Sequence, residues 1–416
     1  MKVAIIGSGI AGNTIAYHLH KNHDITLFES QSHIGGHSHT HHIQHEGQDI
    51  NVDTGFIVFN DRTYPNFMAL LKELNVVWQP SSMSFSVRCE ETGLEYNGTT
   101  LNSLFAQRFN LLRPSFHKMI LDILRFNKTS LELLDNLSEI KLGEYLKLGG
   151  YSKQFIDYYI IPMGSAIWST DTKQMLDFPA RFLVRFFHNH GMLSIDDRPK
   201  WMTIAGGSDN YVKELTRPFS KSIRLNSPVE SVRRLKSSVR IKPKHGSEEV
   251  FDYVFFACHS DQALKILTDP TPAEREVLGK IHYQANTILL HHDQRLMPKK
   301  KLAWAAWNYH VTNPAPRHVA VTYDMNILQG IRSEQHLLVT LNHIHDIDSK
   351  KIIKRIEYMH PVYTSEGVSA QSRHAEISGV NRTGFAGAYW GNGFHEDGVV
   401  SALEAIKHFE HFFNAN

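Results

Sequence analysis

The 416-residue sequence predicts an α/β fold in which a parallel sheet near the N-terminus is joined to an inserted α+β region. Three observations support this fold class. A short apolar strand leads directly into a glycine-rich turn and a helical pattern, the residues from about 61 to 204 have helical spacing, and strand patterns return from about 205 onwards. The chain is longer than one hydrophobic core usually serves, so we expect two domains.

The first predicted domain is discontinuous. It takes residues 1–60, 205–270 and 380–416, and the second domain takes residues 61–204 and 271–379. Helical segments such as "YPNFMALLKEL" and "SFHKMILDILRFNKTSLELLDNL" fill the first part of the insertion. The strands "SIRLNSPVESVRRL", "SVRIKPK" and "VFDYVFFAC" predict a meander that returns to the first sheet, and "NTILLHHD", "HVAVTYD" and "HLLVTLNHI" predict a second sheet.

The opening strand, "VAII", is followed by Gly7-x-Gly9-x-x-Gly12 and by the helical pattern "NTIAYHLHKN". In such a turn the first glycine permits the tight bend, the second leaves room for a pyrophosphate, and the third lets helix and strand pack closely. The helix N-terminus, at Ile10 and Ala11, adds partial positive charge. The pattern therefore predicts a dinucleotide site.

A second apolar strand, "DITLFES", ends at Glu29 and Ser30, about twenty residues after the glycines. An acid at this distance is placed to accept hydrogen bonds from a ribose hydroxyl. An NAD-dependent dehydrogenase would share this fingerprint. The βαβ unit alone therefore leaves the choice of dinucleotide open.

Composition narrows the class of partner. Lys and Arg number 44 against 42 Asp and Glu, giving a net charge of +2, which offers no electrostatic argument for nucleic acid. Cys89 and Cys258 lie far apart and form no disulfide framework, which fits a reducing compartment. Glycines interrupt the N-terminal apolar run, and "YYIIPMGSAIW" is about half the roughly 20 residues of a membrane span. We expect a cytoplasmic protein with a small-molecule partner.

The C-terminal segment, "GFAGAYWGNGFHEDGVVSALEAIKHFEHFF", predicts a strand, a glycine-rich turn and an amphipathic helix. This is a second place where a loop opens a helix whose N-terminus can face a phosphate or a cofactor. Glu396 and Asp397 are candidate contacts for that cofactor, or caps for the helix.

These motifs together resemble a known family. Gly7, Gly9, Gly12 and Glu29, the pair Gly35-Gly36, and "DTGF" from Asp53 resemble the flavin-containing amine oxidase and phytoene desaturase superfamily over nearly the whole chain. The likeness is closer to bacterial NAD/FAD-binding amine-oxidase-like proteins, through "VDTGFIVFNDRTYPNF", "PMGSAIWST" and "AYWGNGFHEDG". Members of that subgroup are often encoded beside enzymes that resemble cyclopropane fatty acid synthases, which hints at lipid substrates. The resemblance implies FAD and a Rossmann-like FAD-binding domain of the glutathione reductase type.

The resemblance also implies which residues bind the cofactor, some through the backbone alone. They are Gly7, Gly9, Ile10, Ala11, Gly12, Glu29, Ser30, Gly35, Gly36, His37, Asp53, Thr54, Gly55, Phe56, Val229, Ala257, Gly387, Gly393, Phe394, His395, Glu396, Asp397 and Gly398. The sequence departs from the family in three ways: His37 stands where an arginine is usual, "AGAYWG" replaces the usual AG-x-E segment, and the lysine that many amine oxidases hold near flavin N5 is not identifiable.

The stretch "HIGGHSHTHHIQH" places His37, His39, His41 and His45 on one face of an extended strand, an arrangement that could bind a metal. The chain has 27 histidines in all, and the flavin fingerprint already accounts for the position of this stretch. We therefore predict no metal site, and of these four histidines we assign only His37 to the cofactor.

The expected chemistry is transfer of a hydride from a substrate C–H to flavin N5. The candidates for lining the substrate cavity are Trp168, His188, His190, Trp201, Tyr389, Trp390 and Phe394. Because the amine-oxidase features are incomplete, a desaturase or dehydrogenase of an apolar lipid or acyl substrate is preferred to an amine oxidase. A non-catalytic FAD-binding redox sensor or scaffold is the alternative from another class, and an NAD-dependent dehydrogenase leaves the second glycine pair unexplained. A lipid substrate would allow peripheral membrane contact; the oligomeric state stays open.

Overall fold

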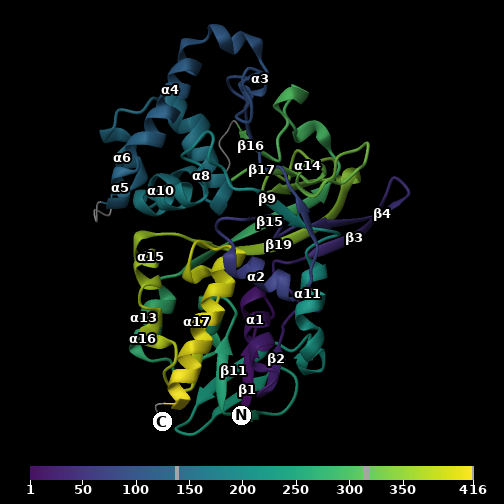
Figure 1. Ribbon diagram of the computed structural model, residues 1–416, viewed down its shortest axis with the longest axis vertical. Helices are drawn as coiled ribbons and strands as arrows, with labels where there is room; N and C mark the ends of the chain where they lie inside the picture. Colours follow the sequence, from purple (N-terminus) through teal and green to yellow (C-terminus); the bar gives the residue numbers. More distant parts are fainter. Residues whose placement is uncertain (136–139, 313–318, 415–416) are drawn as a thin grey trace.

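The computed structural model describes residues 1–135, 140–312 and 319–414. Figure 1 shows an elongated molecule with both termini at one end and the helices of residues 101–189 at the other. The sheet that contains the N-terminal strand lies near the termini, and a larger sheet lies between it and the helical end. The protein is therefore a mixed α/β fold, as the sequence predicts.

The sheet near the termini has five parallel strands in the order β10-β2-β1-β14-β20. Their bounds are Lys2–Ile6 (β1), Asp24–Phe28 (β2), Ile223–Arg224 (β10), Tyr253–Phe256 (β14) and Thr383–Phe385 (β20). Helices α1 (Ile10–Leu19) and α17 (His395–Asn414) share a core with one face of this sheet. Burial on both faces explains why β1 and β14 are continuous apolar runs.

The opposite face is covered by a meander and four short helices. They are β11 (Val229–Arg234), β12 (Val239–Pro243), β13 (Glu249–Phe251), α12 (Ser260–Ile266), α13 (Pro272–Gly279), α15 (Ser365–Gln371) and α16 (His374–Ile377). The sequence assigned residues 271–379 to the second domain, yet Val277 of α13 and Ile377 of α16 pack in the core of the first sheet. A local pattern shows that such helices are amphipathic, but not which sheet they cover.

Two further helices pack beside α1. Residues of α2 (Pro65–Glu73) and α11 (Asp209–Thr216) share a core with Ile10 of α1 and Phe56. Helix α2 was assigned to the second domain from its sequence position, and it too lies against the first. The detailed division into two domains stays a prediction.

The larger sheet has seven strands in the order β19-β15-β18-β17-β16-β7-β8. Their bounds are Ile352–Val362 (β19), His282–His291 (β15), Leu338–Leu341 (β18), Val321–Asp324 (β17), Trp307–Val311 (β16), Phe85–Cys89 (β7) and Glu95–Asn97 (β8). The sequence predicted the strands at β15, β17 and β18. It missed β7 and β8, which lie in the segment expected to be helical, and β19.

Two small sheets join the large elements. One is the hairpin β3 (Thr40–His45) and β4 (Gln48–Asp53), and the other contains β5 (Phe59–Asn60), β9 (Trp201–Ile204) and β6 (Trp78–Pro80). Strand β9 pairs with both β5 and β6 and so ties the end of the helical segment back to residues near the first sheet.

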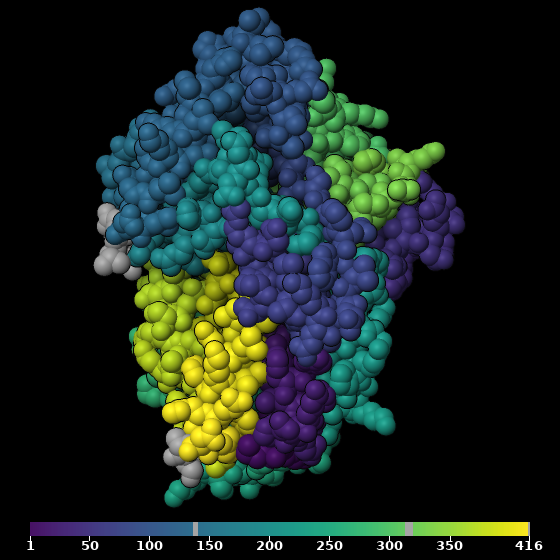
Figure 2. Space-filling model, in the orientation of Figure 1, coloured from purple at the N-terminus to yellow at the C-terminus, as the bar shows by residue number. Residues whose placement is uncertain are grey.

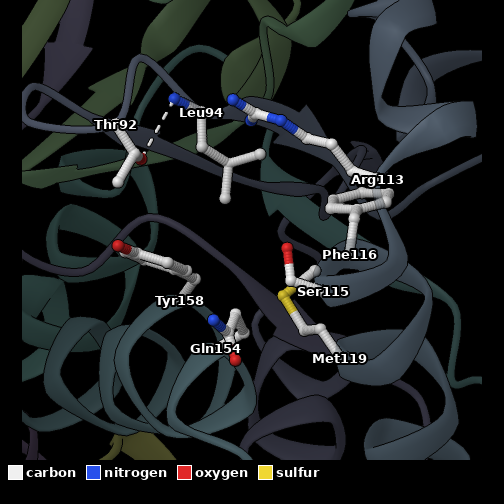
Figure 3. Close-up of a pocket in the computed structure, with 8 residues that line it drawn as sticks. All are labelled: Thr92, Leu94, Arg113, Ser115, Phe116, Met119, Gln154 and Tyr158. Atoms are coloured by element: carbon white, nitrogen blue, oxygen red, sulfur yellow. Dashed lines mark hydrogen bonds between the residues drawn. The ribbon is translucent and has the colours of Figure 1, made fainter.

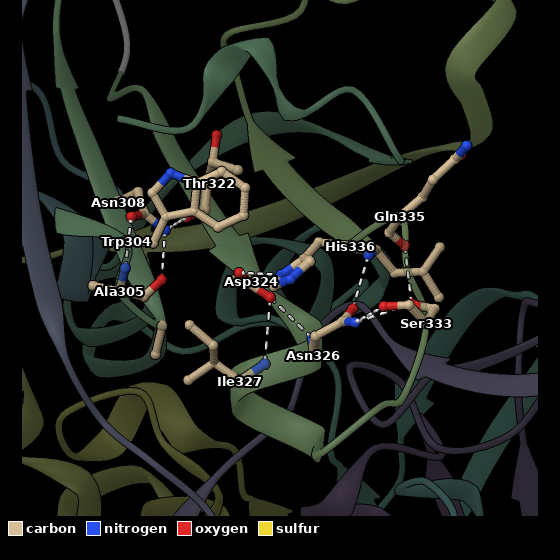
Figure 4. A network of polar contacts seen from close by, with 12 residues as sticks. Trp304, Ala305, Asn308, Thr322, Asp324, Asn326, Ile327, Ser333, Gln335 and His336 are labelled. Carbon is tan, nitrogen blue, oxygen red and sulfur yellow. Dashed lines mark hydrogen bonds and ion pairs between the residues drawn. The ribbon is translucent and has the colours of Figure 1, made fainter. Parts of the chain in front are cut away.

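A polar network fixes the turn that follows β17 (Figure 4). The carboxylate of Asp324 accepts hydrogen bonds from the backbone N–H groups of Asn326 (3.0 Å) and Ile327 (3.3 Å), the first turn of α14 (Met325–Gln329). His336 Nδ1 lies 2.7 Å from the same carboxylate. This cap holds the short helix in place, and its last residue, Gln329, hydrogen-bonds Asp53 of β4.

The helical end is built from short helices around a core of apolar side chains. They are α3 (Leu101–Leu104), η1 (Arg108–Leu112), α4 (Pro114–Thr129), α5 (Glu132–Asp135), α6 (Leu142–Leu148), α7 (Lys153–Phe155), η2 (Ile156–Ile160), α8 (Ile161–Trp168), α9 (Thr172–Leu176) and α10 (Ala180–Asn189). Across the described residues, no helix is both long enough and apolar enough to cross a bilayer.

The run from α7 to α8 contains a π-helical segment, η2, just before Pro162. Proline has no N–H and cannot donate to the carbonyl of Tyr158 four residues earlier. The hydroxyl of Tyr96, on β8, donates to that carbonyl at 2.6 Å. A residue of the larger sheet therefore satisfies a backbone group that the proline leaves open.

We predict that Tyr96→Phe lowers the free energy of unfolding by about 1 to 2 kcal/mol, because it removes a buried hydrogen bond. Urea unfolding of the FAD-saturated protein measures this. In a Pro162→Ala background, where residue 162 regains its N–H, the same substitution should cost less. Equal costs in the two backgrounds would contradict the role assigned to Tyr96.

Candidate functional site

The glycine turn after β1 is packed against the end of β14. Gly7 has a φ of +105°, and a Cβ atom there would lie 2.6 Å from the carbonyl oxygen of Ala257. A Cβ atom at Gly12 would lie 1.9 Å from the carbonyl oxygen of Gly7. A Cβ atom at Gly9, in contrast, would have no heavy atom within 4 Å. The first and third glycines are thus required for packing, and the second faces open space.

The N-terminus of α1 is buried without a side-chain cap. Ile10, Ala11 and Gly12 are all buried, and the N-cap residue, Gly9, offers no side chain. The first N–H groups of a helix need a partner, and an anionic ligand is one that suits them. The arrangement fits the phosphate-binding role predicted from the sequence.

The second glycine pair returns to this turn. The N–H of Gly35 donates to the carbonyl of Ser8 at 2.9 Å, and a Cβ atom at Gly36 would lie 3.1 Å from the Cα of Gly9. Gly55 passes close to the carbonyl of His37, where a Cβ atom would be 2.2 Å from the oxygen. Residues of three separate motifs therefore meet around Gly9.

Glu29 lies at the carboxyl end of β2, where the sequence placed it. Its carboxylate accepts hydrogen bonds from the backbone N–H groups of Ser8 (2.9 Å) and Gln31 (2.8 Å) and from the hydroxyls of Ser8 and Ser30. The backbone carbonyl of Glu29 accepts from the N–H of Ser227, two residues before Val229. The predicted cofactor residues Glu29 and Val229 thus lie on neighbouring segments, and their contact with the cofactor stays a prediction.

The first turn of α17 lies against the first turn of α1. A Cβ atom at Gly398 would lie 2.6 Å from Cγ2 of Ile10, so only glycine allows this approach. The positive ends of two helix dipoles therefore converge on one region. Gly387 and Gly393, also predicted as cofactor residues, shape the loop before α17: Gly387 donates to Ser401 Oγ, and Gly393, at φ +93°, lies against Tyr363.

Glu396 and Asp397 have other partners. The carboxylate of Glu396 accepts from the backbone N–H groups of Asn66 (3.0 Å) and Phe67 (2.9 Å) and so caps α2. Asp397 accepts from the N–H of Phe394 at 2.8 Å, and burial raises the pKa of Asp397 to about 6. The carboxylates of both acids are already engaged by N–H groups of α2 or of the loop before α17. Their predicted contacts with the cofactor stay predictions.

His395 is buried in a polar triangle beside the cofactor region. Its Nε2 lies 2.8 Å from Ser38 Oγ and 2.9 Å from the hydroxyl of Tyr211, and its ring stacks on Phe56 with centroids 3.5 Å apart. Burial keeps the pKa of His395 well below its usual range. The imidazole is neutral and fixes the start of α17 against the second glycine motif.

Asp53 and Thr54 form hydrogen bonds with residues from several distant segments of the chain. Asp53 is fully buried, and its carboxylate accepts from Thr40 Oγ1 (2.5 Å), from the N–H and hydroxyl of Ser208, and from Gln329. Burial raises the pKa of Asp53 to about 6. Thr54 Oγ1 lies 3.0 Å from the hydroxyl of Tyr358 on β19. These residues have structural partners, and their contact with the cofactor stays a prediction.

His37 meets residues that sequence reasoning missed. Its ring centroid lies 4.7 Å from that of Tyr358 and 5.6 Å from that of His360, both on β19. Burial, with smaller effects from His259 and His39, lowers the pKa of His37 to about 4. Burial likewise lowers the pKa of His259 to about 4 and that of His360 to about 3. Three half-buried, neutral histidines therefore lie at the junction of the two large sheets.

His360 also belongs to a buried hydrogen-bond network. Its Nδ1 lies 2.9 Å from Ser169 Oγ and accepts from Nδ2 of Asn286 at 3.2 Å, while Asn286 accepts from Asn342. Because an amide nitrogen can only donate, Nε2 of His360 carries the proton. The residues come from β15, β19 and the positions just after α8 and β18, too far apart in sequence for any local pattern to connect them.

Several predicted cavity residues form one aromatic wall. Phe186, from α10, lies between Trp168 (4.9 Å between centroids), Phe394 (5.1 Å) and His190 (3.8 Å). Trp201 lies 6.3 Å beyond His190. Trp168 Nε1 donates to the carbonyl of Asn392 in the loop before α17. The helical insertion thus reaches the cofactor region through aromatic side chains, of which Phe186 was not predicted.

The remaining cavity candidates lie elsewhere. His188 was expected to line the cavity, but it is exposed, because it falls on the outer face of α10, whose buried face carries Phe186 and Phe187. Trp390 packs on His374 (4.4 Å) in the core of the first sheet, and Tyr389 lies 6.3 Å from Tyr283. His188 therefore lies away from the buried face of α10, and Trp390 belongs to the packing of the first sheet; the substrate-cavity roles of these residues stay predictions.

The histidines of residues 33–45 do not all form one cluster. The ring of His39 lies 4.1 Å from that of His33 and 4.1 Å from that of His41, whereas His37 lies in a turn before β3 and His45 Nε2 donates to the carbonyl of Gln335. Within the described ranges, no three His, Cys, Asp or Glu side chains gather in a way that could hold a metal ion. Burial lowers the pKa values of His39 and His41 to about 4.

A separate cavity of about 200 Å³ lies in the helical end, away from the glycine turn (Figure 3). It is lined by Thr92, Leu94, Arg113, Ser115, Phe116, Met119, Gln154 and Tyr158. Figure 3 shows the Arg113 side chain along one edge and Phe116 and Met119 on the α4 wall. None of the predicted site residues lines it.

The parallel sheet, the double glycine motif and the converging helix N-termini define a dinucleotide-binding protein with an added seven-stranded sheet. Residues 10–405 match the family model of the flavin containing amine oxidoreductases. The chain belongs to this family, which confirms the resemblance seen in the sequence and FAD as the cofactor. The glycine turn, the uncapped N-terminus of α1 and Glu29 together suit the binding of FAD.

Individual relatives are distant. An L-amino-acid oxidase from Siganus canaliculatus is 23% identical over 69% of this chain, and one from Naja atra is 22% identical over 68%. The chain spans little more than half of these relatives' length, 56% and 57%.

Two solved structures are similar over nearly their whole length. A CLA-producing fatty acid isomerase from P. acnes has a TM-score of 0.70 at 16% identity, covering 98% of each chain. Cyclohexylamine oxidase from Brevibacterium oxydans has a TM-score of 0.71 at 13% identity, covering 99% of each. At these identities the likeness shows a shared fold.

Two glycine substitutions should separate cofactor space from packing. Gly9→Val should give a folded protein without FAD, because its side chain enters the open space before α1. Gly12→Ala should give little folded protein, because the new Cβ would overlap the Gly7 carbonyl. Flavin absorbance and far-ultraviolet circular dichroism measure the two effects. A Gly9→Val protein that retains stoichiometric FAD would place the cofactor elsewhere.

The histidines with lowered pKa values predict an acid-sensitive fold. The folded-state pKa of His259 is about 4, below the usual 6.5, so its contribution to stability is present above pH 6.5 and is lost as the pH falls towards 4. His259 is the N-cap residue of α12, a position that asparagine also favours and can fill without titrating.

Between pH 7.5 and 5, wild-type protein should therefore lose about 2 kcal/mol more unfolding free energy than His259→Asn. Urea unfolding at the two pH values, with FAD in excess, gives the comparison. The exposed-site variant His188→Asn should keep the wild-type dependence. Parallel pH profiles for wild type and His259→Asn would show that His259 is not buried in its neutral form.

Proposed function

We propose that the protein is an FAD-dependent oxidoreductase that removes a hydride from a C–H bond of a small apolar substrate, as a dehydrogenase or desaturase of a lipid or acyl chain. The observation that carries this proposal is the aromatic wall of Trp168, Phe186 and Phe394, which begins in the helical insertion and ends in the loop that opens α17. An apolar molecule held against this wall would lie next to the helix N-terminus that faces the cofactor.

The charges around the wall favour an apolar substrate over an ammonium group. The two acids nearest the wall in sequence, Glu396 and Asp397, are held by backbone N–H groups of α2 and of the loop before α17. Recognition of a cationic amine would call for a carboxylate or an open aromatic face. Phe394 and Phe186 instead stack on each other, with an interplanar angle of 26°.

Bound FAD supplies the acceptor for the hydride. The protein's part is to hold the substrate carbon in place, exclude water and position polar groups. The N-terminus of α17 favours negative charge that develops nearby. His360 offers its Nε2–H as a hydrogen-bond donor, and neutral His37 is able to accept a proton, which a desaturation releases together with the hydride.

Amine oxidation is the second candidate, and the names of the relatives favour it: two are L-amino-acid oxidases and one solved structure is a cyclohexylamine oxidase. The fatty acid isomerase of the same fold supports the proposal of an acyl substrate. A redox sensor or scaffold would need neither an enclosed aromatic wall nor a substrate.

Anaerobic mixing separates these functions, because arrival of a hydride bleaches the oxidised flavin absorbance. We expect bleaching by a panel of saturated and unsaturated acyl substrates, and none by a panel of amines and L-amino acids. Phe186→Ala should lower the second-order rate constant of bleaching about tenfold or more, since it removes a wall of the substrate site. His188→Ala, on the exposed face of the same helix, should leave the rate unchanged. Bleaching by amines alone would overturn the acyl assignment in favour of an amine oxidase. If light reduces the flavin but no substrate in either panel does, the redox-sensor function would be favoured.

A further inference from the structure

The end of the molecule opposite both termini exposes apolar side chains that the fold does not use. We define the α3–α4 tip as residues 101–128. Its exposed members are Leu101, Phe109, Leu111, Leu112, Leu121 and Leu124, which are 78%, 66%, 50%, 77%, 61% and 45% exposed. Single exposed leucines are ordinary, but a group of them in one segment marks an interaction surface.

Hydrogen bonds between α3, η1 and α4 hold the segment that carries these side chains in one conformation. Arg108 donates to the carbonyls of Asn102 and Phe105, which joins η1 to α3. His117 Nε2 donates to the carbonyl of Leu111 at 2.8 Å, which joins η1 to α4. The apolar residues of η1 therefore form a fixed surface with the start of α4.

Helix α4 has two apolar faces. Phe116, Met119 and Phe126 are buried in the core of the helical end. Leu121 and Leu124 point outward, on the face that also carries His117 and Lys128. Packing accounts for the inner face alone, because Leu121 and Leu124 remain exposed in the described part of the chain.

The charge of the tip is one-sided. Residues 101–128 contain the cations Arg108, Arg113, Lys118, Arg125 and Lys128, and the single acid is Asp122. Asp122 is 1% exposed and is paired with Arg125 (3.0 Å) and Lys118 (3.4 Å). The next acids along the chain, Glu132 and Asp135, lie in α5. The exposed charge of the tip itself is therefore positive.

The shape of the tip favours a fluid partner. Figure 2 shows this segment, in blue, as a convex end of the molecule rather than a groove. A protein partner would need a matching concavity, whereas a lipid surface deforms around inserted leucines while long basic side chains reach the headgroups. Anionic lipid adds an electrostatic attraction for each Lys or Arg near the surface.

We propose that the α3–α4 tip docks on an anionic lipid surface, with Leu111, Leu112 and Leu121 inserted among the headgroups and Arg108, Lys118 and Lys128 beside the phosphates. This inference stands on the surface alone and does not depend on which substrate reduces the flavin. Arg113 and Phe116 of the tip also line the 200 Å³ cavity of Figure 3, which therefore lies on the membrane-facing half of the protein.

Sedimentation with vesicles tests the proposal on the FAD-loaded protein. We expect binding to phosphatidylglycerol-containing vesicles, at least tenfold weaker binding to pure phosphatidylcholine vesicles, and weakening with added salt. The double substitution Leu111→Glu/Leu112→Glu should reduce the partition coefficient at least tenfold. The matched control Val77→Glu/Val250→Glu changes two exposed apolar residues outside the tip, 70% and 53% exposed, and should leave binding unchanged.

A reporter inside the tip gives a second measurement. The tryptophan emission of Leu112→Trp should shift to shorter wavelength with anionic vesicles and should be quenched by brominated lipid. The proposal is overturned if neither vesicle type binds the protein, or if the control pair weakens binding as much as the tip pair. It is also overturned if the tip leucines instead mediate self-association that Leu111→Glu/Leu112→Glu abolishes.

Discussion

The cofactor end of this protein depends on one close contact, the approach of the first turn of α17 to the first turn of α1. Gly398 permits it, because any larger side chain would meet Ile10, and Gly12 permits the matching approach of α1 to the β1 turn. The two helices bring segments nearly 390 residues apart in the sequence to one point (Figure 1). Two helix dipoles then favour negative charge at the same place, which is what a pyrophosphate and a flavin ring require.

The surrounding polar groups serve this contact more than the chemistry. Glu396 caps α2, Asp397 caps the loop before α17, and His395 is fixed between Ser38 and Tyr211. Glu396 and His395 are buried and have partners from distant parts of the chain, whereas Asp397 bonds the loop that precedes it. These contacts fix the backbone at the predicted cofactor site, next to the aromatic wall of the helical insertion.

The sequence predicts the features that depend on neighbouring residues. The glycine turn, the βαβ unit, the meander and the C-terminal strand and helix all appear where local pattern placed them, because turn chemistry and periodicity act over a few residues. Partners that meet only through the fold were missed: Glu396 with α2, His37 with β19, and Phe186 in the aromatic wall. His188 lies away from the buried face of α10 because a two-residue shift from His190 moves a side chain to the other face of a helix.

The central claim is that FAD lies across the two converging helix N-termini with its flavin ring against the α17 loop. A crystal structure of the FAD-loaded protein tests this most directly. The account predicts the pyrophosphate at the N-terminus of α1 beside Gly9 and the flavin ring between Gly398 and the wall that contains Phe394. Density for FAD with its ring on the far side of α17, or a pyrophosphate away from Gly9, would contradict it.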